Sequence, residues 1–268
     1  MEKGLFLDDG KIFYPKDVVE AIKKVGIKSG DVVFVHTDIS KFGRLAEVKE
    51  RREFNITFLN ACLEATGHNG TLVVPTFTYS FGDEFGAKKF FDIENTPSIL
   101  NYFTEVARTS NGFQRSDDPM LSVVSKGPLT PDLIDNLSTC CLGKGSVWER
   151  LHEKNAHNLM LGFKFDSTFI HYIENYFRVP YRHDIELTGI IKKNKKQFKK
   201  TYTYFARDRK IKIKLNREKL YLLALEKKIL KKTTLGAGEI MSIKSKDLFS
   251  VSGKMLEENP YSLVTIPK

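Results

Sequence analysis

Asn158–Gly162 (NLMLG) is an apolar run of strand length, and beyond the loop 163–167 follows Thr168–Asn175 (TFIHYIEN), which has the pattern of a helix start. A strand that leads through a short loop into a helix N-terminus is typical of α/β folds, in which ligands bind at the strand ends. His171 and Glu174 are three residues apart and so share one face of the predicted helix. The imidazole and the carboxylate can therefore belong to one site, with His171 as a general base.

Strand and helix patterns alternate along the chain before Arg182. Strands are predicted at 31–35, 71–74 and 122–124. Helices are predicted at 16–25, 51–65 and 97–108, the last with Thr96 as its N-cap and Pro97 in its first turn. This alternation predicts an α/β fold with three layers, α/β/α, and a central mixed sheet.

The pattern changes after Arg182. Residues 187–193, 197–206 and 210–215 alternate polar and apolar side chains, which predicts antiparallel strands, and 216–232 has the pattern of a helix with a leucine-rich face. We interpret 184–232 as a strand-plus-helix insertion that follows the helix carrying His171 and packs on a single domain, 1–268. Residues 239–266 predict a further strand and helix that return to the core.

The composition is that of an ordinary globular protein. Of the 268 residues, 41% are hydrophobic and 28% are charged, so one large domain can form a core. No apolar run approaches the length of a membrane span, and the N-terminus lacks the pattern of a signal peptide. Three cysteines, two of them adjacent, argue against a disulfide framework. We expect a cytoplasmic protein with no membrane association.

The formal charge of +10 is concentrated in one segment. Residues 191–232 hold 17 Lys and Arg against 3 Asp and Glu, whereas the remainder of the chain is slightly acidic. Such a segment is either a solvated face or a surface that attracts an anionic substrate or coenzyme. Nucleic-acid binding would favour stacking aromatic residues or a groove-reading motif, and only Tyr202, Tyr204 and Phe205 offer aromatic rings there. Nucleic acid is therefore not the partner we expect.

Four further motifs accompany the His171 segment, in a fixed order. They are His36–Gly43 (HTDISKFG), Gly70–Thr76 (GTLVVPT), Phe91–Ser98 (FDIENTPS) and Arg115–Ser122 (RSDDPMLS). With Thr168–Glu174 (TFIHYIE), this series resembles the aminoglycoside 3-N-acetyltransferase family, whose members show H-S-S-L-S-x-[LI]-G, G-T-[LIV]-[VL]-x-P-[TS], T-P-[ST], R-S-x-[HN]-P-x-x-S and T-x-x-H-x-x-E. The resemblance runs from about Lys16 to Arg182, with a looser match at 235–239.

The resemblance implies acetyl transfer from acetyl-CoA to an amino group of a sugar, by direct attack in a ternary complex. His171 matches the family's base, and Glu174 would orient its ring. Asp118 stands where the family has His or Asn. We predict that Asp118 is a third catalytic residue, which contacts the acceptor amine or orients His171, although a simple Asx turn is the alternative.

The resemblance also implies binding residues for both substrates. Those predicted to bind the coenzyme are His36, Thr37, Ser40, Lys41, Thr76, Arg115, Ser116 and Ser122. Those predicted to bind the acceptor are Asp92, Asp117 and Thr168. Thr37 and Asp38 replace the family's two serines, and Thr96 and Ser98 could equally be helix caps.

The nature of the acceptor stays open at this stage. No metal is expected, because the six histidines are scattered and no metal-ligand spacing occurs. Aminoglycosides are polycations, whereas the basic segment favours an anionic acceptor such as a nucleotide-linked amino sugar, provided that the segment faces the cleft. The alternative is a catalytically silent relative that binds nucleic acid or other anions through 191–232. A homo-oligomer is possible.

Overall fold

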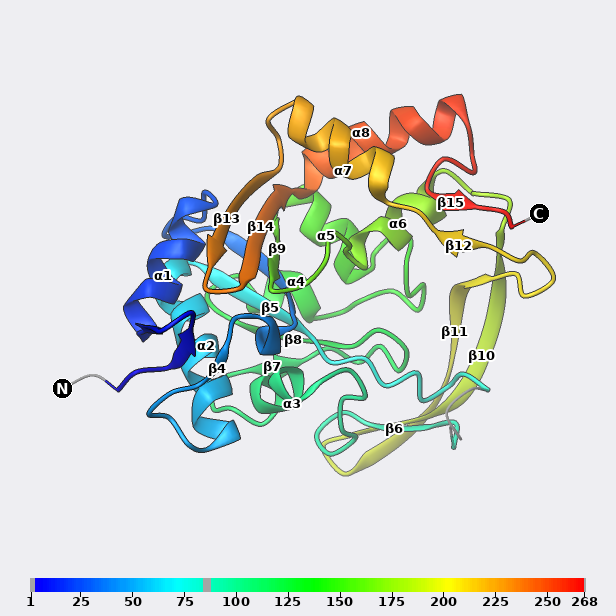
Figure 1. The fold of residues 1–268 in the computed structure, drawn as a ribbon. Coiled ribbons are helices and arrows are strands. Elements are labelled where there is room, and N and C mark those ends of the chain that lie inside the picture. Colours follow the sequence, from blue (N-terminus) through cyan, green and yellow to red (C-terminus); the bar gives the residue numbers. More distant parts are fainter. Residues whose placement is uncertain (1–2, 84–87, 268) are drawn as a thin grey trace.

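The computed structural model describes residues 3–83 and 88–267 (Figure 1). In this part of the chain the central sheet has seven strands, of which β9, β3 and β5 are parallel to one another and the others run antiparallel to their neighbours. Their order across the sheet is β13 (Lys231–Leu235), β14 (Gly238–Lys244), β9 (His157–Leu161), β3 (Val32–Thr37), β5 (Thr71–Pro75), β8 (Val123–Lys126) and β7 (Gln114–Arg115).

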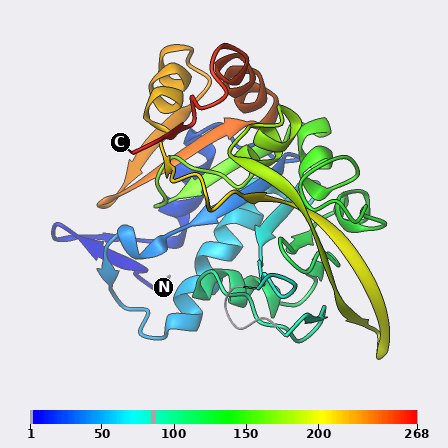
Figure 2. The same cartoon turned by 90° about the vertical axis from the view of Figure 1, so that its right-hand side faces the viewer.

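Helices cover both faces of this sheet (Figures 1 and 2). One face packs on α1 (Pro15–Lys24), α2 (Arg51–Thr66) and α3 (Tyr102–Arg108), and the other on α4 (Thr130–Ile134), α5 (Val147–Glu153), α6 (Phe169–Tyr176), α7 (Glu218–Glu226) and α8 (Ser245–Glu258). Successive side chains of β3 point to opposite faces, so that Val33 and Val35 join one hydrophobic cluster and Phe34 joins the other. The predicted three-layer α/β/α fold with a mixed sheet is therefore confirmed.

The segment after α6 forms a long antiparallel hairpin of β10 (Arg182–Lys193) and β11 (Lys196–Arg207). Arg182 pairs with Arg207 at its base, and Lys193 pairs with Lys196 at its tip. The far half of β10 also pairs with β6 (Phe90–Asp92). Figure 2 shows the hairpin extending from the layered body. Together with α7, it confirms the predicted antiparallel strand-plus-helix insertion.

Small strands complete the described structure. β1 (Phe6–Asp8), β2 (Lys11–Phe13) and β4 (Arg44–Leu45) form a separate sheet near the N-terminus, and β12 (Lys214–Leu215) pairs with β15 (Val264–Thr265). A single 3-10 turn, η1 (Ile39–Lys41), follows β3. In the described residues, no helix combines the length and the apolar character needed to cross a bilayer.

Several predicted elements have different bounds in the structure. Of the strand predicted at 210–215, only Lys214–Leu215 forms one. The helix predicted from Pro97 begins only at Tyr102, because the Asn101 side chain accepts from the N–H of Thr104, while Thr96 Oγ1 accepts from the N–H of Asp92 in a turn. The helix predicted over 216–232 ends with α7 at Glu226. Residues 231–235 form β13 instead, because they pair with β14 at the edge of the sheet.

Candidate active site

The parallel strands β3 and β9 end at the same edge of the sheet, and α6 begins above that edge. His36, near the end of β3, accepts a hydrogen bond at Nε2 from the backbone N–H of Thr168, at 3.1 Å. Its ring stacks on Phe163 in the β9–α6 loop, with 5.5 Å between centroids. Burial lowers the pKa of His36 to about 4, so the ring is neutral and can accept this bond. His36 thus joins the end of β3 to the start of α6.

His171 and Glu174 form the predicted pair on one face of α6. The Nδ1 atom of His171 lies 2.7 Å from Glu174 Oε2, and the Glu174 side chain has no exposed surface. Burial alone would raise the pKa of Glu174, but His171 and the neighbouring guanidinium groups lower it well below its usual range. The carboxylate is therefore ionised, and His171 donates its Nδ1 proton to it.

Three further side chains hold the Glu174 carboxylate. Arg182 Nε lies 2.8 Å from Oε2, while Arg217 Nη2 lies 3.3 Å from Oε1 and the hydroxyl of Tyr181 donates to Oε1 at 3.1 Å. Two guanidinium groups and a phenol thus compensate for the burial of one carboxylate, as a buried charge requires.

The ring of His171 is neutral and has one ring nitrogen without a partner in the described part of the chain. Burial lowers its pKa, as does Arg182, and both effects outweigh the opposite effect of Glu174, so the ring is neutral near pH 7. With the proton on Nδ1, the lone pair is on Nε2, which has no hydrogen-bond partner among the described residues. A quarter of the side chain is exposed, which leaves the ring accessible to a substrate.

A pocket of about 350 Å³ opens at the end of β3, one residue beyond His36. Its walls are formed by Thr37, Asp38, Ile39, Ser40, Gly43, Leu45, Arg51, Phe54, Asn55, Asn101, Tyr102 and Phe103. Two of these, Thr37 and Ser40, were predicted as coenzyme-binding residues. The N-terminal turn of α2 supplies Arg51, whose guanidinium lies 4.2 Å from the centre of the Tyr102 ring. Asn101 Nδ2 donates to the carbonyl of Thr37 at 2.9 Å.

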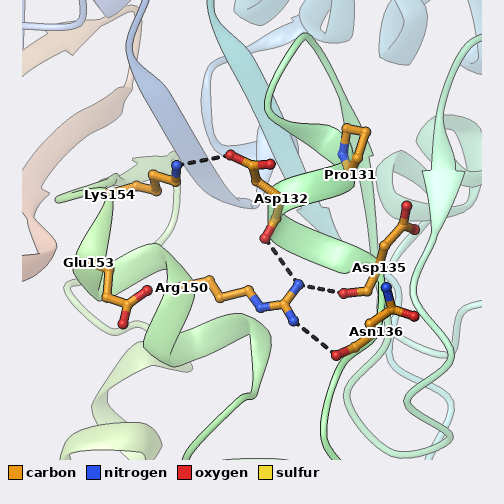
Figure 3. A pocket seen from close by; sticks show the side chains of 7 residues that line it. All are labelled: Pro131, Asp132, Asp135, Asn136, Arg150, Glu153 and Lys154. Carbon is orange, nitrogen blue, oxygen red and sulfur yellow. Dashed lines mark hydrogen bonds and ion pairs between the residues drawn. The ribbon is translucent and has the colours of Figure 1, made fainter.

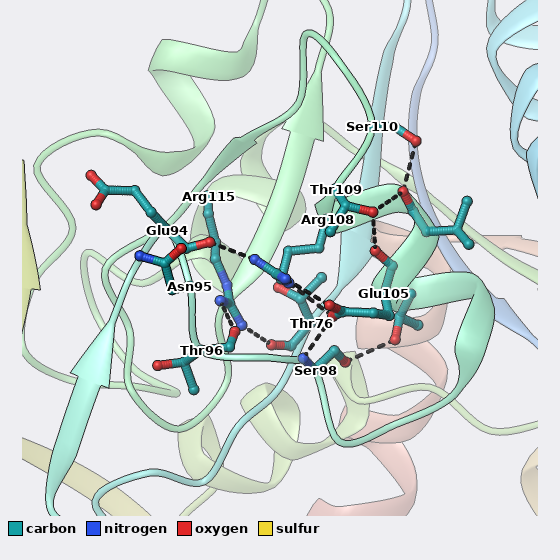
Figure 4. A network of polar contacts seen from close by, with 12 residues as sticks. Thr76, Glu94, Asn95, Thr96, Ser98, Glu105, Arg108, Thr109, Ser110 and Arg115 are labelled. Atoms are coloured by element: carbon teal, nitrogen blue, oxygen red, sulfur yellow. Dashed lines mark hydrogen bonds and ion pairs between the residues drawn. The ribbon is translucent and has the colours of Figure 1, made fainter.

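Arg115, Thr76 and Ser122, which were predicted to bind the coenzyme, contact one another in a network of polar contacts within the protein. Figure 4 shows Arg115 and Thr76 in this network. Arg115 donates to the carbonyls of Thr76 (2.7 Å), Thr96 (2.5 Å) and Ile93 (3.2 Å), and to Ser122 Oγ (3.2 Å). Burial and the nearby Arg108 lower the pKa of Arg115 to about 9. Its donors are committed to the protein, and Arg115 does not line the pocket at Thr37.

A comparison with known proteins identifies the family. The family model described as aminoglycoside 3-N-acetyltransferase matches residues 34–257. The chain belongs to this family. An aminoglycoside N(3')-acetyltransferase-like protein derived from the SPbeta prophage of Bacillus subtilis is 24% identical over 186 residues, which cover 62% of this chain and 66% of that protein. Aminoglycoside N(3)-acetyltransferase III of Acinetobacter baumannii is 28% identical over 184 residues, 62% of this chain and 61% of that enzyme.

The matched stretch thus spans less than two thirds of the length of either curated relative. Solved structures extend the likeness in fold. The structure of AAC-IIIb with CoASH has a TM-score of 0.77 at 20% identity and covers 91% of this chain and 96% of that chain. The aminoglycoside acetyltransferase AAC(3)-Xa has a TM-score of 0.76 at 21% identity, with 91% and 92% covered.

Asp118, at the position where the family has His or Asn, does not orient His171. Its Oδ1 accepts from the backbone N–H groups of Met120 (2.8 Å) and Leu121 (2.9 Å), and the thiol of Cys141 lies 3.4 Å away. These bonds make the Asx turn that was the alternative interpretation, and Glu174 occupies the Nδ1 position of His171. Contact of Asp118 with the acceptor amine stays a prediction. Burial raises the pKa of Asp118 to about 6.

The other predicted acceptor residues lie against the hairpin. Asp92 Oδ2 pairs with Lys192 at 2.8 Å while its Oδ1 accepts from backbone N–H groups, and Asp117 pairs with Lys200 at 3.0 Å. Of the remaining predicted coenzyme residues, Ser116 Oγ accepts from the N–H of Val123, and Lys41 is exposed outside the pocket walls. The structure therefore brings together His36, Thr168, His171 and Glu174, with Thr37 and Ser40 in the adjoining pocket.

Sequence reasoning missed Arg182 and Arg217. Arg182 ends the last matching segment and had no assigned role, whereas Arg217 lies within the lysine-rich stretch and nothing in its neighbours distinguishes it. Arg217 Nε also lies 3.5 Å from Asp166, and Nη1 donates to the carbonyl of Leu263 at 2.7 Å. Arg217 therefore reaches the site from within the insertion, and Arg182 from the first residue of β10, just before it.

A second cavity, of about 490 Å³, lies between α4 and α5 (Figure 3). Arg150 there donates to the carbonyls of Asp132, Asp135 and Asn136, and Lys154 pairs with Asp132. None of its lining residues belongs to the five motifs or to the cluster around Glu174. No group of His, Cys, Asp and Glu side chains suited to a metal occurs among the described residues.

Proposed function

We propose that this protein transfers the acetyl group of acetyl-CoA to an amino group of an amino sugar, with His171 as general base. The observation that carries the proposal is the hydrogen bond of His171 Nδ1 to the buried, ionised Glu174, which leaves the lone pair on Nε2 of a partly exposed side chain. Membership of the family supports it, as do relatives named aminoglycoside N(3)-acetyltransferase and a structural neighbour solved with CoASH.

His171 would carry the proton through the reaction. An amine arrives mostly as an ammonium ion and becomes nucleophilic only when a base removes a proton. Nε2 accepts that proton, and Glu174 stabilises the resulting imidazolium through Nδ1–H. Acetyl-CoA supplies the activated thioester. As the N–C bond forms and the C–S bond breaks, the nitrogen must lose a second proton. One of the two protons passes through His171 to the departing sulfur and the other leaves to water, so that the neutral amide and the CoA thiol form and the base is regenerated.

The pocket at Thr37 fits part of a CoA molecule. Its volume of about 350 Å³ is in the range of small-molecule sites. The first turn of α2 provides backbone N–H groups, and Arg51 provides a cation, both of which favour phosphate. Apolar walls from Ile39, Phe54 and Tyr102 suit the uncharged arm of the coenzyme. The pocket begins at Thr37, the residue after His36, whose ring contacts the start of α6.

The acceptor proposed here is an amino sugar of either charge. Along β10, the tip residue Lys193 lies roughly 35 Å from Arg182 at about 3.3 Å per residue. Lys192 and Lys200 are also paired with Asp92 and Asp117. The lysines of the tip therefore do not support an anionic acceptor at His171. The panel of acceptors in the assay below decides whether the acceptor is cationic or anionic.

The test is release of the CoA thiol in the presence of acetyl-CoA and a panel of aminoglycosides and nucleotide-linked amino sugars. We expect His171→Ala to lower the rate with the best acceptor by about 10²–10⁴-fold, the usual contribution of a general base. His183→Ala, an exposed histidine of β10, is the matched control and should keep the rate. Full activity of His171→Ala, with circular dichroism showing a folded protein, would refute the assignment of the base.

A further inference from the structure

The carboxylate of Glu174, beside His171, has two arginines around it, more positive charge than is needed to orient the histidine ring. Glu174 is the only carboxylate that the described residues place against His171 Nδ1, yet Arg182 and Arg217 both contact it. Arg182 comes from the first residue of β10, and Arg217 directly precedes α7. Both are nearly buried, with 6% and 7% of their side chains exposed, so water screens these charges poorly.

Arg182 contacts the histidine as well as the glutamate. Its Nη2 lies 3.0 Å from His171 Nδ1, while its Nε faces Glu174 Oε2. Since the Nδ1 proton is directed at Glu174, the guanidinium cannot donate to Nδ1 and instead presents a positive charge to the ring. That charge disfavours the imidazolium form, whereas Glu174 favours it.

We propose that Arg182, assisted by Arg217, is a positioning residue that keeps His171 neutral, so that two arginines outside α6 set the pH range in which the base works. The proposal rests on the function proposed above. It adds that a segment outside the helix that carries the base determines when the base is available.

The charged and titratable groups around His171 are consistent with this role. From each neighbouring element they are Glu174 on α6, Arg182 on β10, Arg217 before α7, His36 on β3, Asp166 in the β9–α6 loop and Tyr181 before β10. Asp166 is paired with Arg217, and His36 is neutral. Arg182 is therefore the positive charge closest to the ring, and its removal should have the largest effect.

The test is the pH profile of kcat/KM with acetyl-CoA and the best acceptor of the panel. The acid limb, where protonated His171 is inactive, should move upward by about one pH unit in Arg182→Gln, the usual size of the effect of one adjacent charge. Arg217→Gln should move it upward by less, because Arg217 contacts Glu174 and not the ring. Arg182→Lys keeps the charge and should restore the limb toward that of the unaltered protein, even where kcat is reduced.

Arg178→Gln is the matched control. Arg178 precedes β10 and pairs with Asp184 on the surface at 2.6 Å, with 55% of its side chain exposed. The acid limb of the pH profile of Arg178→Gln should not move. If Arg182→Gln loses activity while its limb stays in place, the arginine is only structural and the proposal is overturned.

A second measurement does not depend on turnover. Histidine-labelled protein without ligands can be titrated by NMR, with the His171 signal assigned from the spectrum of His171→Ala. We expect His171 of the unaltered protein to titrate below the ordinary histidine range and to move upward in Arg182→Gln. Titration of the unaltered protein at or above that range would refute the proposal, whether or not the variants fold. A low His171 pKa in a protein inactive toward every acceptor would instead refute the proposed function alone.

Discussion

Two buried arginine networks lie on either side of the strand ends, and they differ in what the arginines bind. Arg115 donates to three backbone carbonyls and a serine hydroxyl, so it braces the loop between β6 and α3. Arg182 and Arg217 bind a carboxylate that itself accepts a proton from His171. Carbonyl acceptors do not titrate, whereas the second network ends on a side chain that does.

The comparison shows why a motif arginine does not reveal its role by type or by burial. Both networks satisfy buried polar groups, and each would appear as a stability element if it were viewed alone. Only the second reaches an accessible ring nitrogen. We therefore expect substitutions in either network to lower the free energy of unfolding. Only those in the second network should change the pH dependence of the reaction.

Glu174→Gln should have the largest effect. The change leaves two guanidinium groups buried without their carboxylate, which typically costs about 3–5 kcal/mol of unfolding free energy. Because the pKa of Glu174 is lowered in the fold, its contribution is present at neutral pH and is lost as pH falls below the usual carboxylate range. Urea unfolding at pH 7 and pH 4 measures both effects, and the difference between the two proteins should shrink at pH 4.

The matched control for this variant is Glu105→Gln in the other network. Glu105 accepts two bonds from Arg108 and has 29% of its side chain exposed, so water can replace part of what is lost and we expect a smaller loss, of about 1–2 kcal/mol. Equal losses in the two variants would show that the Glu174 cluster is solvated and would remove the basis for the comparison.

Arg115→Gln tests the bracing network. It leaves the carbonyls of Ile93 and Thr96 without this donor, whereas the carbonyl of Thr76 still accepts from the Ser122 hydroxyl. Each unsatisfied buried group costs about 1–3 kcal/mol unless water replaces the donor. The braced loop leads to Asn101, which lines the pocket at Thr37, so KM for acetyl-CoA should rise. The pH profile of kcat/KM should keep its acid limb. An acid limb that moves as far as in Arg182→Gln would contradict the division into two networks.

The sequence predicted the layers and the central pair, because both depend on local patterns. Apolar strand runs identify the sheet, and the spacing of His171 and Glu174 identifies a shared helical face. The predicted start of α3 was wrong because hydrogen bonds hold residues 93–101 in a loop. The side chains of Thr96 and Asn101 accept from backbone N–H groups, and Arg115, which is distant in sequence, donates to the carbonyl of Thr96. Arg217 was missed because its partner Glu174 is 43 residues away and the surrounding cations are solvated.

The smallest effect is expected from the exposed cations of the hairpin tip. Lys193, Lys195 and Lys196 are exposed, and the tip lies roughly 35 Å along the strand from Arg182. At 0.15 M salt the screening length is about 8 Å, so charges at that distance contribute little at His171. The triple change to Gln should alter the unfolding free energy by less than about 0.5 kcal/mol.

The same variant decides whether the basic segment selects the acceptor. KM values measured for one aminoglycoside and one nucleotide-linked amino sugar should both stay within about twofold of those of the unaltered protein, since screened exposed charges contribute little. A KM that rises severalfold for the nucleotide-linked acceptor alone, and that depends on salt, would mean that the tip contacts the acceptor during binding. In that case the exposed cations, and not only the two buried networks, would belong to the machinery of the site.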